Sequence, residues 1–107
     1  MKAYYKLVRD KIPQIYKKEH KNIKTKKLNK EEFNYYLKIK LKEKVNDFLD
    51  SKTLGQTIDE LTEIYEVLDN ITKNLNLTSA KIKALQDKKR KDLGGFNDKQ
   101  FLILIKE

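Results

Sequence analysis

Two long segments of helical periodicity constrain this fold more than any other feature of the chain. Asn29 and Glu32 have the pattern of a helix N-cap with a capping box, and apolar residues then recur at helical spacing as far as residue 50. Residues 51–55 interrupt the pattern, and a second apolar series runs over residues 58–71 before fading. We therefore expect two amphipathic helices that pack as an antiparallel hairpin.

The regions on either side of the hairpin indicate further, shorter elements. A third helix should begin at Thr78 or Ser79 and stop at Gly94, because a glycine adopts positive φ there at little cost. Pro13 favours the start of a short helix near the N-terminus. Short segments rich in aromatic or branched residues predict β-strands over residues 4–8, 23–28 and 101–105.

The predicted fold class is mainly α, with two or three short β-strands from the chain ends. With 107 residues, of which 38% are apolar, one domain spanning 1–107 and a thin core are expected. Such a core leaves wide apolar helix faces uncovered, so the hairpin and third helix should form a bundle on oligomerisation, as a homodimer or homotetramer.

Several classes of protein are disfavoured by the composition. The chain has no cysteine, so disulfides, thiolate nucleophiles and cysteine-bound metals are excluded. The longest apolar run, residues 101–105, is far shorter than the roughly 20 residues that cross a bilayer, and the N-terminus has no apolar stretch of signal-peptide type. We expect a cytoplasmic protein that has no membrane partner.

The distribution of charge matters more than the formal net charge of +9. Residues 1–30 carry +9, residues 31–75 carry −4 and residues 76–107 carry +4. A basic nucleic-acid-binding protein would spread positive charge over the helices that touch phosphate. The acidic centre therefore argues against a plain nucleic-acid-binding protein.

Several charged residues fall on the seam where the two long helices should meet. Charges at a seam are costly unless they are paired or bound to metal, and carboxylates from facing helices suit Mg²⁺ or Mn²⁺. Two structural alternatives remain open. Glu60 also fits the third position of a capping box begun by Thr57, and residues 43–47 fit an ordinary solvated face. The seam residues are Lys44, Asp47, Glu60 and Glu63.

Four stretches of the chain carry a family resemblance. Residues 5–13, YKLVRDKIP, resemble the N-terminal signature of small MazG-like proteins. These are relatives of phosphoribosyl-ATP pyrophosphohydrolase in the all-α nucleoside triphosphate pyrophosphohydrolase superfamily. Residues 43–49 (EKVNDFL), 60–67 (ELTEIYEV) and 93–96 (LGGF) follow in the family's order. The resemblance covers essentially the whole chain.

The resemblance implies a metal site. The family pattern is EExxE, a spacer and then ExxD, and its carboxylates bind Mg²⁺. Glu43 matches the first Glu, Asp47 the third, and Glu60 and Glu63 the second half of the pattern. By resemblance, Asp47, Glu60 and Glu63 would hold Mg²⁺, or alternatively Mn²⁺, and Glu43 would assist the attacking water. Lys44 stands where the family has its second Glu, and an ammonium cannot coordinate a metal.

The function implied by the resemblance is hydrolysis of a nucleoside triphosphate or deoxynucleoside triphosphate to the monophosphate and pyrophosphate. Such enzymes clear unwanted nucleotides, a house-cleaning role. Basic residues in the flanks are candidates to hold the substrate phosphates, and for each of them a solvated lysine-rich face is the alternative. These candidates are Arg9, Lys11, Lys88 and Arg90. Nothing in the sequence indicates which base or sugar is preferred.

Lys44 leaves three interpretations open. In the first interpretation, the site has lost one metal ligand but keeps its activity with altered metal dependence. Alternatively, the ammonium replaces the metal between Glu60 and Glu63, so that the protein is a catalytically impaired relative that binds nucleotides or a protein partner. In the third interpretation the lysine stem covers apolar surface while its head reaches water.

Overall fold

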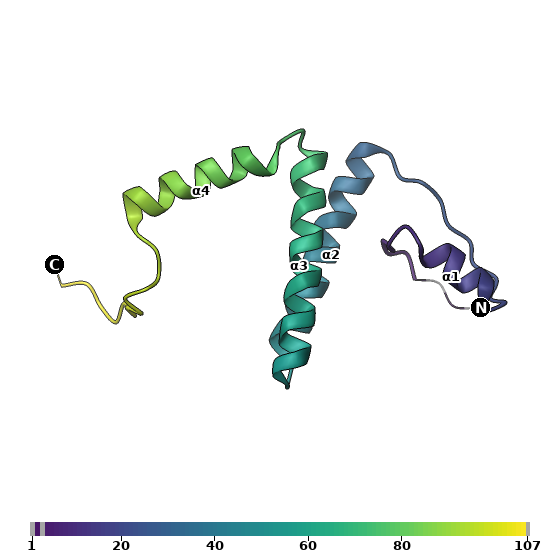
Figure 1. Ribbon diagram of the computed structural model, residues 1–107, viewed down its shortest axis with the longest axis horizontal. Helices are drawn as coiled ribbons and strands as arrows, with labels where there is room; N and C mark the ends of the chain where they lie inside the picture. Colours follow the sequence, from purple (N-terminus) through teal and green to yellow (C-terminus); the bar gives the residue numbers. More distant parts are fainter. Residues whose placement is uncertain (1, 3, 107) are drawn as a thin grey trace. The chain divides into compact units, whose positions relative to one another are not determined.

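The computed structural model describes residue 2 and residues 4–106. Within that part of the chain it has four α-helices and no β-strand (Figure 1). The chain divides into two compact units at Asn76 and Leu77, and each unit is described separately. The helices are α1 Ile12–Lys18, α2 Lys30–Asp50, α3 Leu54–Asn74 and α4 Ser79–Leu93.

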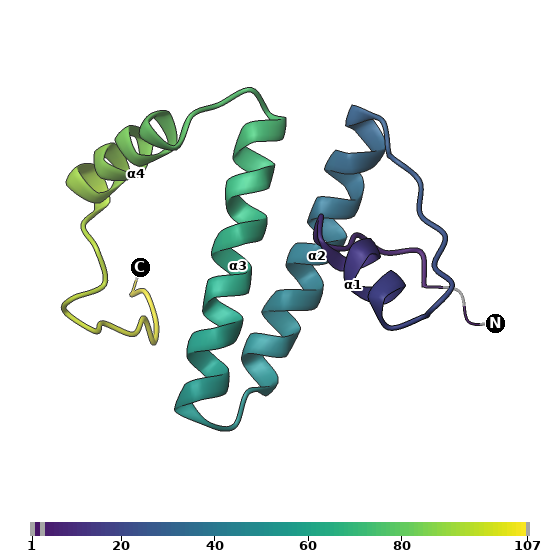
Figure 2. The same ribbon diagram turned by 45° about the vertical axis from the view of Figure 1, so that its right-hand side comes forward.

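The centre of the first unit is the predicted helical hairpin. Helix α2 packs against α3, and the two run antiparallel beside each other (Figure 2). The start of α2 is the expected capping box: the Asn29 side chain accepts from the Glu32 amide at 2.8 Å, and the Glu32 carboxylate accepts from the Asn29 amide at 3.3 Å. These bonds satisfy two amide groups that have no partner within the helix.

Helix α3 begins earlier than the apolar series predicts. Thr53 is its N-cap and accepts from the Gln56 amide at 3.1 Å, so Gly55 lies in the first helical turn instead of the preceding break. Thr57 is inside the helix, and its hydroxyl donates to the Thr53 carbonyl at 2.9 Å. The capping-box alternative for Glu60 is therefore wrong, since the cap it requires lies one turn upstream.

The hydrophobic core of the hairpin is small. Only Leu37 of α2 and Val67 of α3 are buried apolar side chains among the described residues, at 4% and 7% exposure. A hairpin with so little apolar surface removed from water gains only modest hydrophobic stabilisation.

Helix α3 presents a second apolar face, which we call the outer stripe. From residue 54 to residue 68 its members recur at alternating spacings of four and three residues, the period of a helix–helix seam. The last member, Leu75, follows seven residues later at the C-cap, and all six are between 41% and 76% exposed. Helix α2 therefore leaves this face uncovered. The outer stripe consists of Leu54, Ile58, Leu61, Tyr65, Leu68 and Leu75.

The predicted short strands are not found. Residues 4–8, 23–28 and 101–105 lie outside the helices and form no strand in the described part of the chain. Their composition fits a half-buried pleated surface, but a strand also needs a neighbour for its backbone hydrogen bonds. Tyr5 in addition has a φ of +48°, which interrupts an extended backbone. The short helix with Pro13 in its first turn is confirmed as α1.

The second unit contains α4 with the predicted boundaries. The Thr78 side chain accepts from the Lys81 amide at 3.1 Å, and Gly94 ends the helix with a φ of +83°. A side chain at Gly94 would strain this backbone. Within the described residues no helix is both long and apolar enough to cross a bilayer.

Candidate functional site

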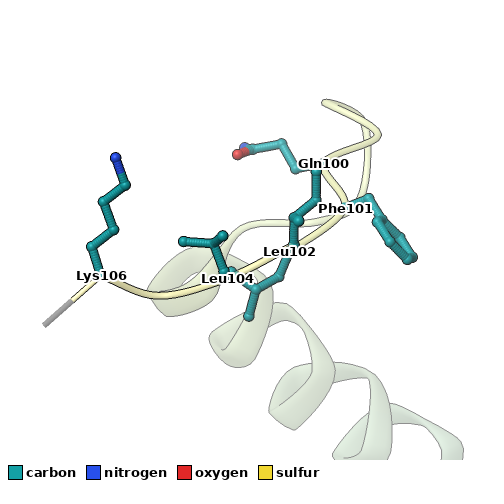
Figure 3. A pocket seen from close by; sticks show the side chains of 6 residues that line it. Gln100, Phe101, Leu102, Leu104 and Lys106 are labelled. Carbon is teal, nitrogen blue, oxygen red and sulfur yellow. The ribbon is translucent and has the colours of Figure 1, made fainter.

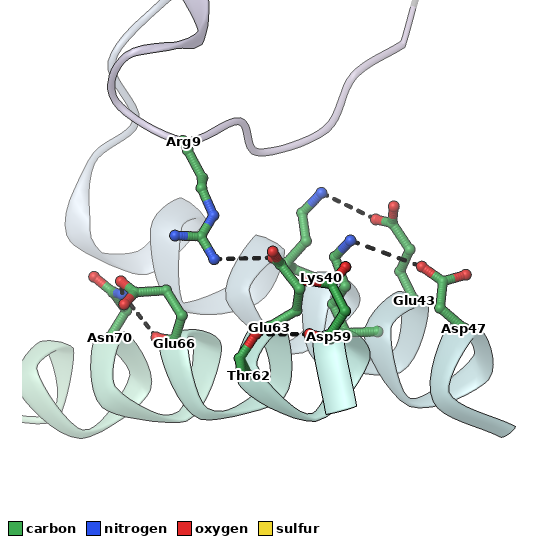
Figure 4. A network of polar contacts seen from close by, with 10 residues as sticks. Arg9, Lys40, Glu43, Asp47, Asp59, Thr62, Glu63, Glu66 and Asn70 are labelled. Atoms are coloured by element: carbon green, nitrogen blue, oxygen red, sulfur yellow. Dashed lines mark hydrogen bonds and ion pairs between the residues drawn. The ribbon is translucent and has the colours of Figure 1, made fainter. Parts of the chain in front are cut away.

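The helical hairpin brings the predicted acidic residues to one region of the first unit. Glu43 and Asp47 are one turn apart on α2, and Glu60 and Glu63 are three residues apart on α3, spacings that put each pair on one helix face. Figure 4 shows Glu43, Asp47 and Glu63 on the two neighbouring helices. The four carboxylates differ in their ion-pair and hydrogen-bond partners.

Glu43 is held by lysines from two parts of the chain. Its carboxylate lies 3.0 Å from Lys40 Nζ and 3.9 Å from Lys6 Nζ. Burial acts to raise the pKa of Glu43, but the hydrogen bond with Lys40 and the nearby charges of Lys40, Lys6 and Lys44 outweigh it, so the pKa is lowered from its ordinary value. Glu43 is therefore ionised at neutral pH.

Lys44 makes an ion pair within its own helix. Its ammonium lies 3.7 Å from the Asp47 carboxylate, and its side chain is 21% exposed. In the described part of the chain it forms no ion pair with Glu60 or Glu63. This arrangement differs from the interpretation in which Lys44 sits between those two carboxylates, and the mostly covered stem fits the interpretation in which it packs on apolar surface.

Glu63 receives its partner from the N-terminal segment. Arg9 Nη2 donates to Glu63 Oε2 at 2.9 Å, across 54 positions of sequence (Figure 4). The hydrogen bond to Glu63, and the negative charges of Glu63 and Glu66, raise the pKa of Arg9 above its ordinary value. The guanidinium is therefore a permanent positive charge beside this carboxylate.

Glu60 differs from the other three carboxylates. It is half-buried, and its Oε2 atom is covered from solvent without a hydrogen-bond partner in the described residues. A covered acceptor of this kind is destabilising unless something satisfies it. Because the N-cap of α3 is Thr53, the helix-cap role does not apply to Glu60, and the described residues leave its Oε2 atom without a partner.

The remaining phosphate-binding candidates fall in two places. Lys11 is exposed at the start of α1. Lys88 and Arg90 lie on α4 in the second unit, where Lys88 pairs with Asp92 at 3.1 Å and Arg90 with Asp87 at 3.4 Å. The structure thus brings Arg9 to the carboxylates, whereas the ion pairs of the two α4 residues stay within their own helix.

Neither of two open hollows is lined by any of these four carboxylates. One of about 610 Å³ is formed by residues of the C-terminal segment, including Phe101, Leu102 and Leu104 (Figure 3). Phe101 is 87% exposed, so this hollow is a solvent-exposed curve of the chain. The other, of about 310 Å³, lies between Lys30, Asn34 and Asn74 where the ends of α2 and α3 meet.

Two partners of the site were not predicted from the sequence. Lys40 lies three residues before Glu43, so helical spacing was a sufficient signal for that pair. Lys6 reaches Glu43 only because the N-terminal segment lies near α2, and no local pattern encodes this contact. No local pattern encodes the contact of Arg9 with Glu63 either; the sequence indicates Arg9 only as a candidate phosphate ligand.

The site's side chains do not form a closed metal cluster. Among the described residues, no three His, Cys, Asp or Glu side chains gather closely enough to hold a metal ion by themselves. Comparison with known proteins gave no match to a family model, to a curated protein or to a solved structure.

Proposed function

We propose that this protein is a Mg²⁺-dependent pyrophosphohydrolase of the MazG-like type, which converts a nucleoside or deoxynucleoside triphosphate to the monophosphate and pyrophosphate. The observation that carries the proposal is the covered, unpartnered Oε2 atom of Glu60. Glu60 is one helical turn from Glu63, on the helix that packs against α2, and α2 carries Glu43 and Asp47. A divalent cation would satisfy this oxygen, whereas no group of the hairpin does.

The carboxylate oxygens of these residues are the type of ligand that Mg²⁺ prefers. Mg²⁺ is usually held by one or two carboxylates, several waters and the substrate phosphates, and does not need a cage made only of protein. Glu60 and Glu63 would be the first ligands and Asp47 a further one. Mn²⁺ accepts the same hard oxygen donors. The absence of a three-residue cluster therefore does not conflict with this mode of binding.

The roles of the residues follow from their charges. The bound cation would neutralise negative charge on the triphosphate and the departing pyrophosphate. Glu43 would accept a hydrogen bond from the attacking water. Its lowered pKa makes it a weak base, so it orients the water more than it removes the proton. The water oxygen would bond to the α-phosphorus as the bond to the bridging oxygen breaks. Pyrophosphate would leave with that electron pair, and the proton that the water loses would pass to solvent. Within the first unit, the cations that would bind phosphate are Arg9 and Lys11.

Self-association belongs to the same proposal. The outer stripe leaves apolar side chains exposed on one face of α3 from residue 54 to residue 68; exposed apolar patches mark association sites, and a homodimer or homotetramer would cover this one. Light scattering at micromolar concentration should give a mass above that of one chain. Leu61→Asp, in the stripe, should lower that mass, and Leu49→Asp, on exposed surface of α2, should not. A wild-type monomer would contradict this part of the proposal.

A second candidate function is favoured by the ion pair of Lys44 with Asp47. This pair neutralises a carboxylate that the metal would need, and Lys44 occupies the place of a family ligand. The protein would then be a catalytically impaired relative that binds a nucleotide or a protein partner. Both candidates keep the same hairpin, and turnover is the property that distinguishes them most directly.

Release of pyrophosphate from a panel of triphosphates with Mg²⁺ or Mn²⁺ separates the candidates. Wild type should release pyrophosphate, and Glu60→Gln should reduce the rate by roughly 10- to 100-fold, the effect expected when a metal site is damaged. Asp69→Asn, an exposed carboxylate on the same helix, is the matched control and should keep the wild-type rate.

Lys44→Glu restores the family's residue and should raise the rate. If wild type is silent and Lys44→Glu turns over, the impaired function stands and the hydrolase proposal for the wild type is wrong. If both are silent while their helical content is intact, the hydrolase proposal is wrong.

A further inference from the structure

The N-terminal segment places a cation directly on one of the proposed metal ligands. Arg9 Nη2 lies 2.9 Å from Glu63 Oε2, the shortest ion pair between distant parts of the described chain. The Arg9 side chain is 57% exposed and that of Glu63 is 29% exposed. Both partners are thus accessible to solvent, and the guanidinium is the more exposed of the two.

The guanidinium and a divalent ion would compete for the negative charge of the Glu63 carboxylate. An oxygen that accepts a charge-assisted hydrogen bond from a guanidinium offers that lone pair poorly to a metal. Yet an ion pair this exposed is weak, because solvent screens it. A divalent ion that gains a second ligand from Glu60 therefore has the advantage over the guanidinium at Glu63.

We propose that Arg9 is an internal competitor of the divalent cation for Glu63. The cation displaces the guanidinium, which is then free to bind a phosphate anion such as the triphosphate chain. Binding of the cation and of the anion are thereby coupled, and by linkage each strengthens the other. This inference rests on the proposed function, because it takes Glu63 as a metal ligand.

Mn²⁺ binding without nucleotide tests the competition directly, by titration with electron paramagnetic resonance detection of the free ion. Arg9→Gln should bind Mn²⁺ about two- to fivefold more tightly than wild type. This factor corresponds to the interaction free energy of an exposed ion pair. Lys18→Gln removes the same charge from an exposed position of α1 and is the matched control. It should leave the affinity unchanged, which separates local competition from the general loss of positive charge.

A double-mutant cycle locates the effect at Glu63. Glu63→Gln should weaken Mn²⁺ binding, and adding Arg9→Gln to it should produce no further gain. If wild type binds Mn²⁺ but Arg9→Gln and Lys18→Gln behave alike, the competition is disproved while the metal site stands. If none of the variants binds Mn²⁺, although their circular dichroism matches that of wild type, the competition and the proposed function fail together.

Discussion

Truncation of Leu37 to alanine should destabilise the hairpin more than truncation of any exposed leucine. Leu37 is 4% exposed and is one of the two buried apolar side chains of the described residues. A buried Leu→Ala change costs roughly 2–5 kcal/mol, depending on how far the surroundings collapse into the cavity. Because this core is thin and open, we expect about 2–3 kcal/mol, the lower part of that range.

Urea unfolding followed by far-ultraviolet circular dichroism measures this difference. Leu49→Ala makes the same chemical change on the same helix, at a side chain that is 70% exposed, and should cost no more than about 0.5 kcal/mol. Small domains have total stabilities of only about 5–15 kcal/mol, so the midpoint should fall clearly for Leu37→Ala. Equal losses for the two variants would refute the packing of α2 on α3 described above.

Two further predictions concern the cap of α2 and the pH dependence of stability. Asn29→Ala removes the capping box with Glu32 and should cost about 1 kcal/mol, whereas Asn46→Ala, an exposed position inside α2, should not lower the urea midpoint. The lowered pKa of Glu43 contributes stability above its ordinary value of 4.5, which is lost as pH falls through the folded value. Glu43→Gln removes this titration, so its urea midpoint should fall less than that of wild type between about pH 5 and about pH 3. An unchanged acid sensitivity in that variant would contradict the ion pair with Lys40.

Local signals predicted the helices well. Capping residues at Asn29 and Thr78 and the glycine at 94 are governed by backbone hydrogen bonds within a few residues, so the sequence alone determines them. The start of α3 was misjudged because the apolar series begins after Gly55. The cap itself is set by Thr53, a polar residue that periodicity does not detect.

Non-local contacts explain what the sequence could not predict. The chain-end segments, such as residues 101–105, have strand-like composition, but strands depend on partners elsewhere, and composition does not supply them. The placement of the carboxylates on the hairpin followed from helical phase. Their partners Arg9 and Lys6 depend on how the N-terminal segment lies on the hairpin, which no local pattern reports.

The most direct test of the account is the identity of the products formed from a nucleoside triphosphate. Wild-type protein incubated with the triphosphate and Mg²⁺, and followed by ³¹P nuclear magnetic resonance, should yield the monophosphate and pyrophosphate, with the Glu60→Gln variant strongly slowed. Formation of the diphosphate and inorganic phosphate, or unchanged triphosphate with both wild type and Lys44→Glu, would contradict pyrophosphohydrolysis at the seam between α2 and α3.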